Sequence, residues 1–167
     1  MSTSPEPRAA HEREGSAARR WLLAGAVLVT AVGVLHHVDH VIRGDLVVAN
    51  GLPKTWNHSG WPFQESVTAF TASLGVYVLL VPGIVLTLRR RVGANYWIAT
   101  ATVIGAIVVF VHFVPLSDET EYPSVIYATY EGGAGGVLAL VVVFALVTAI
   151  AVLGVVAVRA RRRLKVR

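Results

Sequence analysis

The sequence predicts an all-α fold, a four-helix bundle integral to a membrane, with both termini on the cytoplasmic side. Hydrophobic residues make up 54% of the 167 positions, above the roughly 45–50% of a soluble domain. They gather into four apolar stretches, each close to or above the ~20 residues that a helix needs to cross a bilayer. Basic residues border these stretches mainly on one side. Together these features predict a multi-pass protein of a plasma membrane.

The composition also excludes several classes of partner and site. The isoelectric point near 10.1 is explained by charges at the ends of apolar stretches, so no nucleic-acid partner is needed. No cysteine is present, which excludes disulfides, thiolate metal sites and cysteine nucleophiles. The only methionine is Met1, which excludes thioether ligation of copper.

The N-terminal part of the chain predicts a tail followed by a first span. Residues 1–20 are polar without apolar periodicity, so we expect a disordered cytoplasmic tail. Residues 21–42 are almost entirely apolar and predict the first span. A signal peptide is an alternative, because a basic tail precedes the apolar run and Ala31-Val32-Gly33 is a small-x-small pattern. The apolar run continues past that point, which favours a span.

Three further apolar stretches predict the remaining spans. In chain order they cover about residues 63–88, 96–114 and 132–158. Pro82-Gly83 lies inside the second span and predicts a kink there. Residues 159–167 predict a basic cytoplasmic tail, which follows a membrane domain of residues 21–158.

The distribution of charge predicts the orientation of the spans. Of the 15 Lys and Arg residues, 13 lie in the terminal tails or in the short loop between the second and third spans. Only Arg43 and Lys54 lie on the opposite side. The positive-inside rule therefore places both termini in the cytoplasm. The longer loops and the outer helix ends are then the places to look for function.

A cluster of ionisable residues ends the first span. It comprises His36, His37, Asp39, His40 and Arg43. On a helix, His36 and His40 lie one turn apart on the same face. Polar residues inside a span are expensive to insert and are functional candidates by default. The cluster therefore predicts a site at the outer end of the first helix.

The predicted orientation brings more ionisable residues to a similar depth. Spans one and three both run outward, so His112, three residues before Pro115, reaches the depth of the cluster. Spans two and four run inward, and each has a carboxylate in its first turn. The candidate metal ligands in the outer half are His36, His37, Asp39, His40, His58, Glu65, His112 and Glu131.

These side chains suit two kinds of cofactor. Imidazoles at i and i+4, such as His36 and His40, can share one ion, and ligands from another helix complete the set. Zn²⁺, Cu²⁺ and non-haem iron are the compatible ions, and Asp39 is placed to orient one ring. Alternatively, His36 or His40 faces His112 across the bundle, and the pair binds a b-type haem. The sequence leaves both alternatives open.

The run His36-His37-Val38-Asp39-His40 resembles one histidine box, His-His-x-x-His, of the membrane-bound di-iron desaturases and hydroxylases. That resemblance implies di-iron oxygenation. Those enzymes carry several boxes on the cytoplasmic side, whereas this sequence has one box, which its charges place outside. The overall plan is also similar to that of small four-helix b-type cytochromes, a likeness of architecture that implies a haem.

Interpretations without a metal are also open. Asp39 and Arg43, four residues apart on a helix, predict an interfacial ion pair, and the helix dipole favours first-turn carboxylates without any function. The chain is then a non-catalytic subunit or scaffold that binds a partner membrane subunit or a second copy through small-residue faces such as Gly132 and Gly136. A proton-coupled carrier or pH sensor is a further alternative. No nucleophile–base pair or phosphate loop is visible, so no reaction is predicted.

Overall fold

The computed structural model describes residues 6–49, 69–114 and 122–165. Within these ranges the chain is all-helical and has no strand, which confirms the predicted all-α class there. The helices are α1 (Glu6–Ala49), α2 (Ala69–Ser73), α3 (Val76–Leu88), α4 (Ala94–Phe113), α5 (Pro123–Thr129) and α6 (Gly133–Lys165).

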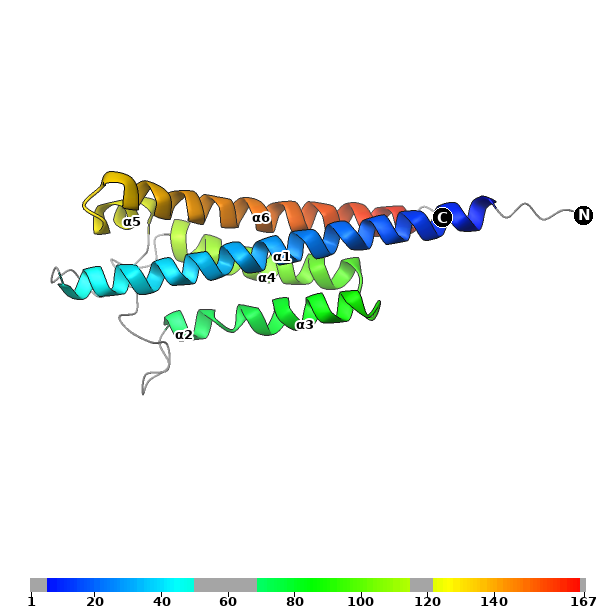
Figure 1. The fold of residues 1–167 in the computed structure, drawn as a ribbon, viewed down its shortest axis with the longest axis horizontal. Helices are drawn as coiled ribbons and strands as arrows, with labels where there is room; N and C mark the ends of the chain where they lie inside the picture. Colours follow the sequence, from blue (N-terminus) through cyan, green and yellow to red (C-terminus); the bar gives the residue numbers. More distant parts are fainter. Residues whose placement is uncertain (1–5, 50–68, 115–121, 166–167) are drawn as a thin grey trace, which may run out of the picture.

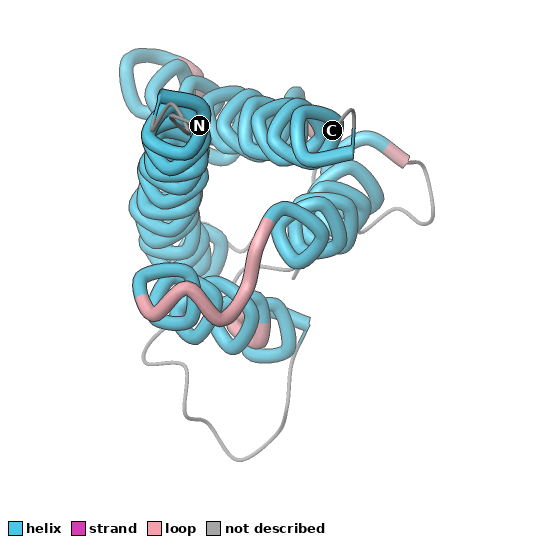
Figure 2. Tube along the Cα trace, turned by 90° about the vertical axis from the view of Figure 1, so that its right-hand side faces the viewer, coloured by secondary structure: helices cyan, strands magenta, loops and turns pink. Residues whose placement is uncertain are grey.

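The four longer helices lie side by side (Figure 1), and the end view shows them arranged around a common centre (Figure 2). Helix α6 packs against both α1 and α4, and α3 packs against α1 and α4 on the other side. The N-terminal end of α1 and the C-terminal end of α6 lie at the same end of the molecule (Figure 1). Helices α1 and α4 run in the same direction (Figure 1), and their C-terminal parts meet where His36 lies against His112.

Three helices contain segments long and apolar enough to cross a membrane. These segments are Gly15–Gly44, Ala94–Phe113 and Gly133–Arg163. Helix α3 is apolar but has only 13 residues, and residues 63–68 of the predicted second span lie outside the described residues. The fourth crossing and the cytoplasmic placement of the termini therefore remain predictions.

The outward faces of the helices are apolar. Large hydrophobic side chains such as Leu28, Val78 and Leu138 are more than half exposed. A water-soluble monomer rarely leaves so much apolar surface uncovered, whereas lipid tails solvate such a surface well. The exposed surface therefore agrees with contact to a lipid bilayer.

Helix α1 begins earlier than the sequence pattern indicates. Residues 6–20 are expected to form an irregular tail, but the structure has them as the first turns of the 44-residue α1. Ala, Arg and Glu are abundant in this segment, and all three favour helix. Extending an existing helix also avoids the cost of nucleation, so a polar composition alone does not end the helix.

The described part of the second predicted span has a break that the sequence does not indicate. Helix α3 continues through Pro82, so this residue does not end the helix, and a kink there stays a prediction. The helix is interrupted at Leu74 and Gly75, between α2 and α3, where bonds such as Gly75 N to Ala72 O, 3.0 Å, span three residues. At Pro82 the missing N–H costs one helical bond, and the close packing of α3 on α4 supports the helix there.

Gly83 makes the close contact between α3 and α4 possible. A Cβ atom at this position would lie 2.5 Å from Cε1 of Tyr96 and 2.9 Å from Trp97. Trp97 is fully buried and its Nε1 donates to Oγ1 of Thr87 at 2.8 Å. This contact fixes α4 against α3 at the end opposite the histidines.

The connection into the last helix contains a short helix that the sequence does not indicate. Helix α5 is followed by a turn in which Glu131, Gly132 and Gly133 have φ values of 53°, 77° and 67°. Glycine adopts this conformation without the steric cost that other residues carry. The turn places Tyr130 against the C-terminal part of α1, where its hydroxyl reaches Asp39.

Candidate metal centre

His36 and His40 project from α1 into the interior of the molecule. They are separated by one helical turn, and their exposed fractions are 5% and 6%. Nε2 of His40 lies 3.1 Å from Nε2 of His36. The predicted arrangement of these two rings on one helical face is therefore present.

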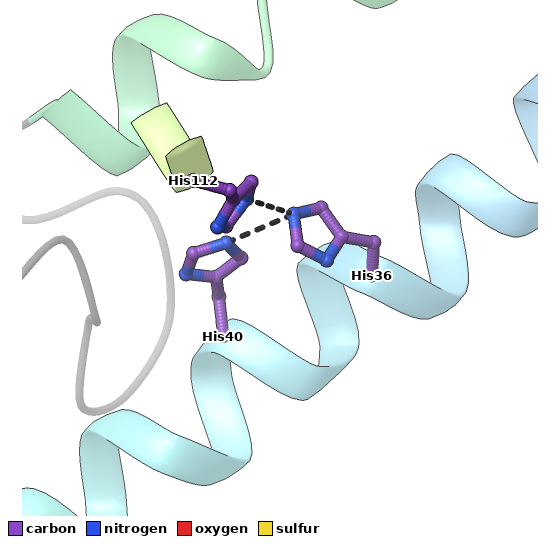
Figure 3. Close-up of side chains that lie close together, drawn as sticks. All are labelled: His36, His40 and His112. Carbon is purple, nitrogen blue, oxygen red and sulfur yellow. Dashed lines mark hydrogen bonds between the residues drawn. The ribbon is translucent and has the colours of Figure 1, made fainter. Parts of the chain in front are cut away.

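His112 joins the pair from the last turn of α4, as Figure 3 shows. It is 1% exposed, and its Nε2 lies 3.1 Å from Nε2 of His36. Ligand atoms of the three rings all lie within 4.8 Å of one another. The structure thus brings together three histidines from two helices; we call this group the histidine trio.

Protons alone do not satisfy the contacts of the histidine trio. A ring nitrogen carries either one proton or one in-plane lone pair, so Nε2 of His36 makes one good hydrogen bond and not two. A cation accepts several lone pairs at once. In a tetrahedral zinc site with Zn–N bonds of 2.0–2.1 Å, neighbouring nitrogens are about 3.3 Å apart, close to the 3.1 Å observed here.

The other nitrogen of His36 supports the same conclusion. Nδ1 of His36 is buried and has no hydrogen-bond partner among the described residues. Buried polar atoms nearly always have a partner, so a ring with one crowded and one unsatisfied nitrogen is expensive to bury. Coordination of an ion by Nε2 would offset part of that cost.

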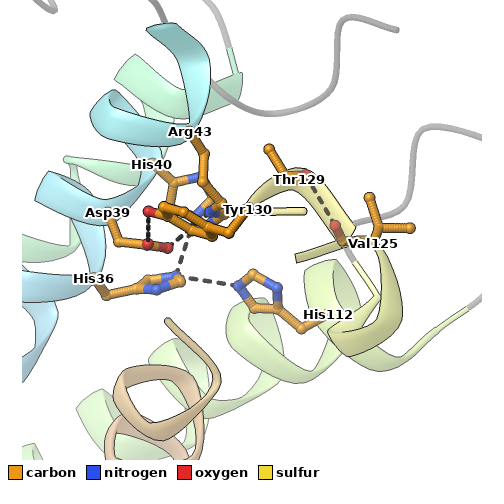
Figure 4. A network of polar contacts seen from close by, with 8 residues as sticks. All are labelled: His36, Asp39, His40, Arg43, His112, Val125, Thr129 and Tyr130. Carbon is orange, nitrogen blue, oxygen red and sulfur yellow. Dashed lines mark hydrogen bonds and ion pairs between the residues drawn. The ribbon is translucent and has the colours of Figure 1, made fainter. Parts of the chain in front are cut away.

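Asp39 belongs to a neighbouring network rather than to the histidine trio. Nε of Arg43 donates to Oδ2 of Asp39 at 2.7 Å, and the Tyr130 hydroxyl donates to Oδ1 at 2.6 Å (Figure 4). Arg43 is fully buried. Since these bonds engage both carboxylate oxygens of Asp39, the structure gives no support to its predicted role in orienting a histidine ring. The predicted ion pair is present.

Tyr130 is suited to its role as a hydrogen-bond donor. Its pKa is raised above the usual value of a tyrosine, first by burial and then by its hydrogen bond to the Asp39 carboxylate. The hydroxyl therefore keeps its proton at any physiological pH. It ties the α5–α6 turn to α1 directly above the histidine trio.

His37 faces a different helix. Its Nδ1 lies 2.8 Å from the carbonyl of Gly33 and 3.0 Å from the hydroxyl of Tyr77, and its Nε2 lies 3.0 Å from Oγ of Ser73. Both ring nitrogens therefore have partners within the protein. These bonds tie α1 to α2 and α3, so the role of His37 in the structure is explained without a metal ion.

The other predicted ligands are not brought to the trio by the described structure. Glu131 is exposed in the turn before α6. His58 and Glu65 lie outside the described residues. Tyr130, Ser73 and Tyr77 surround the site but were not among the predicted ligands. A four-residue spacing on the second span could have indicated Ser73 and Tyr77, whereas nothing in the sequence connects Tyr130 with Asp39.

A bis-histidine haem does not fit this arrangement. Its two axial ligands lie on opposite faces of the porphyrin, whereas Nε2 of His36 and Nε2 of His112 are 3.1 Å apart. The adjoining cavity has a volume of about 50 Å³, which is enough for a few water molecules and too small for a macrocycle. The geometry favours a single ion.

No protein-family model, curated protein or solved structure matches this chain. The functional conclusion therefore depends on the geometry of the histidine trio and on the apolar character of the helices.

Proposed function

We propose that this chain is a multi-pass plasma-membrane protein that binds one divalent transition-metal ion through His36, His40 and His112. The observation that carries the proposal is the grouping of three buried histidines: Nε2 of His36 lies 3.1 Å from Nε2 of His40 and from Nε2 of His112, and ligand atoms of all three rings lie within 4.8 Å of one another. The Nε2 separations match those of neighbouring ligands of a bound ion.

Zn²⁺ is the ion that the ligand set favours. Imidazole nitrogen suits zinc, copper and iron, but no carboxylate belongs to the trio among the described residues. The trio therefore differs from the two-histidine, one-carboxylate set of many non-haem iron sites. Zn²⁺ has no geometric preference of its own and is bound by three histidines in known sites.

The proposed topology has four crossings, with both termini in the cytoplasm and the histidine trio in the outer half. The charge count supports this orientation, since 13 of 15 basic residues fall on the side of the termini. The position of the ends of α1 and α6 at the same end of the molecule also supports it. A reporter fused after Arg167 should be active only in a cytoplasmic format, and activity in an extracytoplasmic format would refute the topology.

The metal proposal is tested by metal content. Protein purified in detergent and dialysed against Zn²⁺ should retain about one ion per chain. His36→Ala, His40→Ala and the double variant should each lose a similar, large part of the affinity, because every one of them leaves an incomplete set of ligands. His112→Ala should behave in the same way.

His37→Ala is the matched control for these variants. It removes the same side chain from the same helix, but its nitrogens are bonded to Gly33, Ser73 and Tyr77. Metal content should stay near one ion per chain. Equal metal content in the trio variants and the parent, or no metal in the parent, would refute the metal site and favour the partner-subunit or proton-coupled interpretations.

A further inference from the structure

A cavity of about 50 Å³ adjoins the histidine trio. The rings of His36, His40 and His112 form one side of it, and apolar side chains such as Val76, Leu80 and Ile104 form much of the rest. A single water molecule needs about 10–15 Å³ by this measure. The cavity therefore has room for a ligand of only a few atoms.

The trio supplies three ligands, whereas zinc in a tetrahedral site takes four. Metal sites that bind exogenous molecules characteristically have three protein ligands and one open position. Since the cavity borders all three rings, a ligand placed in it would lie next to the metal.

The charge of the site determines which ligand is favoured. Three neutral imidazoles leave the full double positive charge of the ion in place, and the cavity walls are mainly apolar. The nearest described ion pair, Asp39 and Arg43, is neutral as a pair. A buried charge without compensation is unfavourable, so an anion in the cavity would be attracted to the ion and would reduce the net charge.

Other polar groups at the cavity do not compete for this role. His37, Ser73 and Tyr77 also line it, but they are hydrogen-bonded to one another and to the backbone. The ion is then the strongest anchor for an anion in the cavity.

We propose that the fourth coordination position is a binding site for a small monovalent anion of about three or four non-hydrogen atoms at most. This inference rests on the proposed metal site. Hydroxide, formed when the ion lowers the pKa of a bound water, and short pseudohalides or carboxylates belong to this class.

The test uses cobalt-substituted full-length protein in detergent, because Co²⁺ takes the place of zinc and absorbs visible light. Cobalt content is measured first and should be about one ion per chain. Titration with azide should then change the visible spectrum with saturation, and benzoate, which is too large for the cavity, should leave it unchanged. Protein without bound cobalt would refute the metal site itself, whereas one cobalt per chain with no response to azide would refute only the anion site.

Two variants relate the response to the cavity. Val76→Phe fills the cavity from α3 and should weaken azide binding at least about tenfold without changing the cobalt content. Val78→Phe is the matched control, because Val78 is on the same helix but is 72% exposed on the outer face. Equal azide affinity in these two variants would contradict binding in this cavity.

Leu80→Ala provides a test that does not require the cavity to be filled. Leu80 is 1% exposed and lines the cavity, so its truncation enlarges the space. The visible spectrum of the cobalt-substituted Leu80→Ala variant should change with benzoate as well as with azide. A cobalt-loaded Leu80→Ala protein that binds azide and still excludes benzoate would show that the cavity does not set the size limit.

Discussion

Trp97 and Thr87 at one end of the molecule, and the histidine trio at the other, differ in how well their buried polar atoms are hydrogen-bonded. At the end formed by the last turns of α3 and the start of α4, Nε1 of Trp97 donates to Thr87, and Oγ1 of Thr87 donates to the carbonyl of Gly83. Each donor there has one acceptor. At the other end, Nε2 of His36 faces two other ring nitrogens, and its Nδ1 has no partner among the described residues.

The difference distinguishes polar groups that hold the fold from polar groups that, on the proposed function, bind an ion. A fully bonded set such as Trp97 and Thr87 stabilises the packing of two helices and needs nothing else. The histidine trio costs stability as it stands, because buried groups without good partners are unfavourable. Variants of Trp97 or Thr87 should therefore lower stability without changing metal content. Variants of the histidine trio should lower metal content without lowering stability.

The largest effect on stability is expected for Trp97→Ala. Trp97 is fully buried, with 0% of its surface accessible to solvent, and its removal leaves a large cavity. The free energy of unfolding should fall by about 3–5 kcal/mol, measured by SDS titration in mixed micelles. Trp21→Ala is the control, since Trp21 is 67% exposed; a similar loss in both variants would show that Trp97 does not anchor this end.

A loss of about 3 kcal/mol is expected for Asp39→Ala, because it leaves the Arg43 guanidinium buried without its carboxylate. The same unfolding measurement applies. The double variant Asp39→Ala, Arg43→Met should recover much of the loss, since a buried ion pair can be replaced by apolar groups at little cost. Failure of the second substitution to recover stability would mean that the pair is not the cause.

Tyr130→Phe should have a smaller effect, about 1.5 kcal/mol, because it removes one hydrogen bond to a charged acceptor. The bond in question joins the hydroxyl to Oδ1 of Asp39 at 2.6 Å. Tyr127→Phe, in the same short connection, is the control: Tyr127 is 41% exposed. If the two variants are equally stable, the Tyr130 bond contributes little to holding the α5–α6 turn on α1.

The smallest effect expected is a dependence on alkaline pH. The pKa of Tyr130 is raised in the folded protein by burial and by Asp39, so above pH ~10 the unfolded chain loses this proton while the folded chain keeps it. Stability from this group is therefore complete below that pH and falls as pH rises above it. Tyr130→Phe should reduce this alkaline slope, and an identical slope in parent and variant would contradict the raised pKa.

Much of the helical plan is predictable from the sequence, because apolar length and flanking charge are local signals. The third predicted span, 96–114, nearly coincides with α4, Ala94–Phe113. The start of α1 at Glu6 and the break at Gly75 were not predicted, since the first depends on helix propagation and the second on local backbone bonds that the apolar pattern does not show. The spacing of His36 and His40 predicted their pairing, and the direction of the spans predicted the approach of His112.

The choice among ligands required three-dimensional contacts. Adjacent residues His36 and His37 look alike in the sequence, and only the rotation of α1 shows which one meets His112. Asp39 looked equally suited to orient a histidine or to pair with Arg43, and the position of Tyr130 favours the second role. These outcomes depend on contacts between residues far apart in the chain, such as the 91-residue separation of Asp39 and Tyr130.

X-ray absorption at the zinc edge tests the metal site most directly, because it counts the imidazoles bound to the ion. Zinc-loaded parent protein should show three imidazole nitrogens at about 2.0–2.1 Å together with one further oxygen or nitrogen ligand that is not an imidazole. His112→Ala should reduce the number of imidazoles to two in whatever metal it retains, and His37→Ala should leave it at three. A spectrum without imidazole, or one that His112→Ala leaves unchanged, would contradict coordination by His36, His40 and His112.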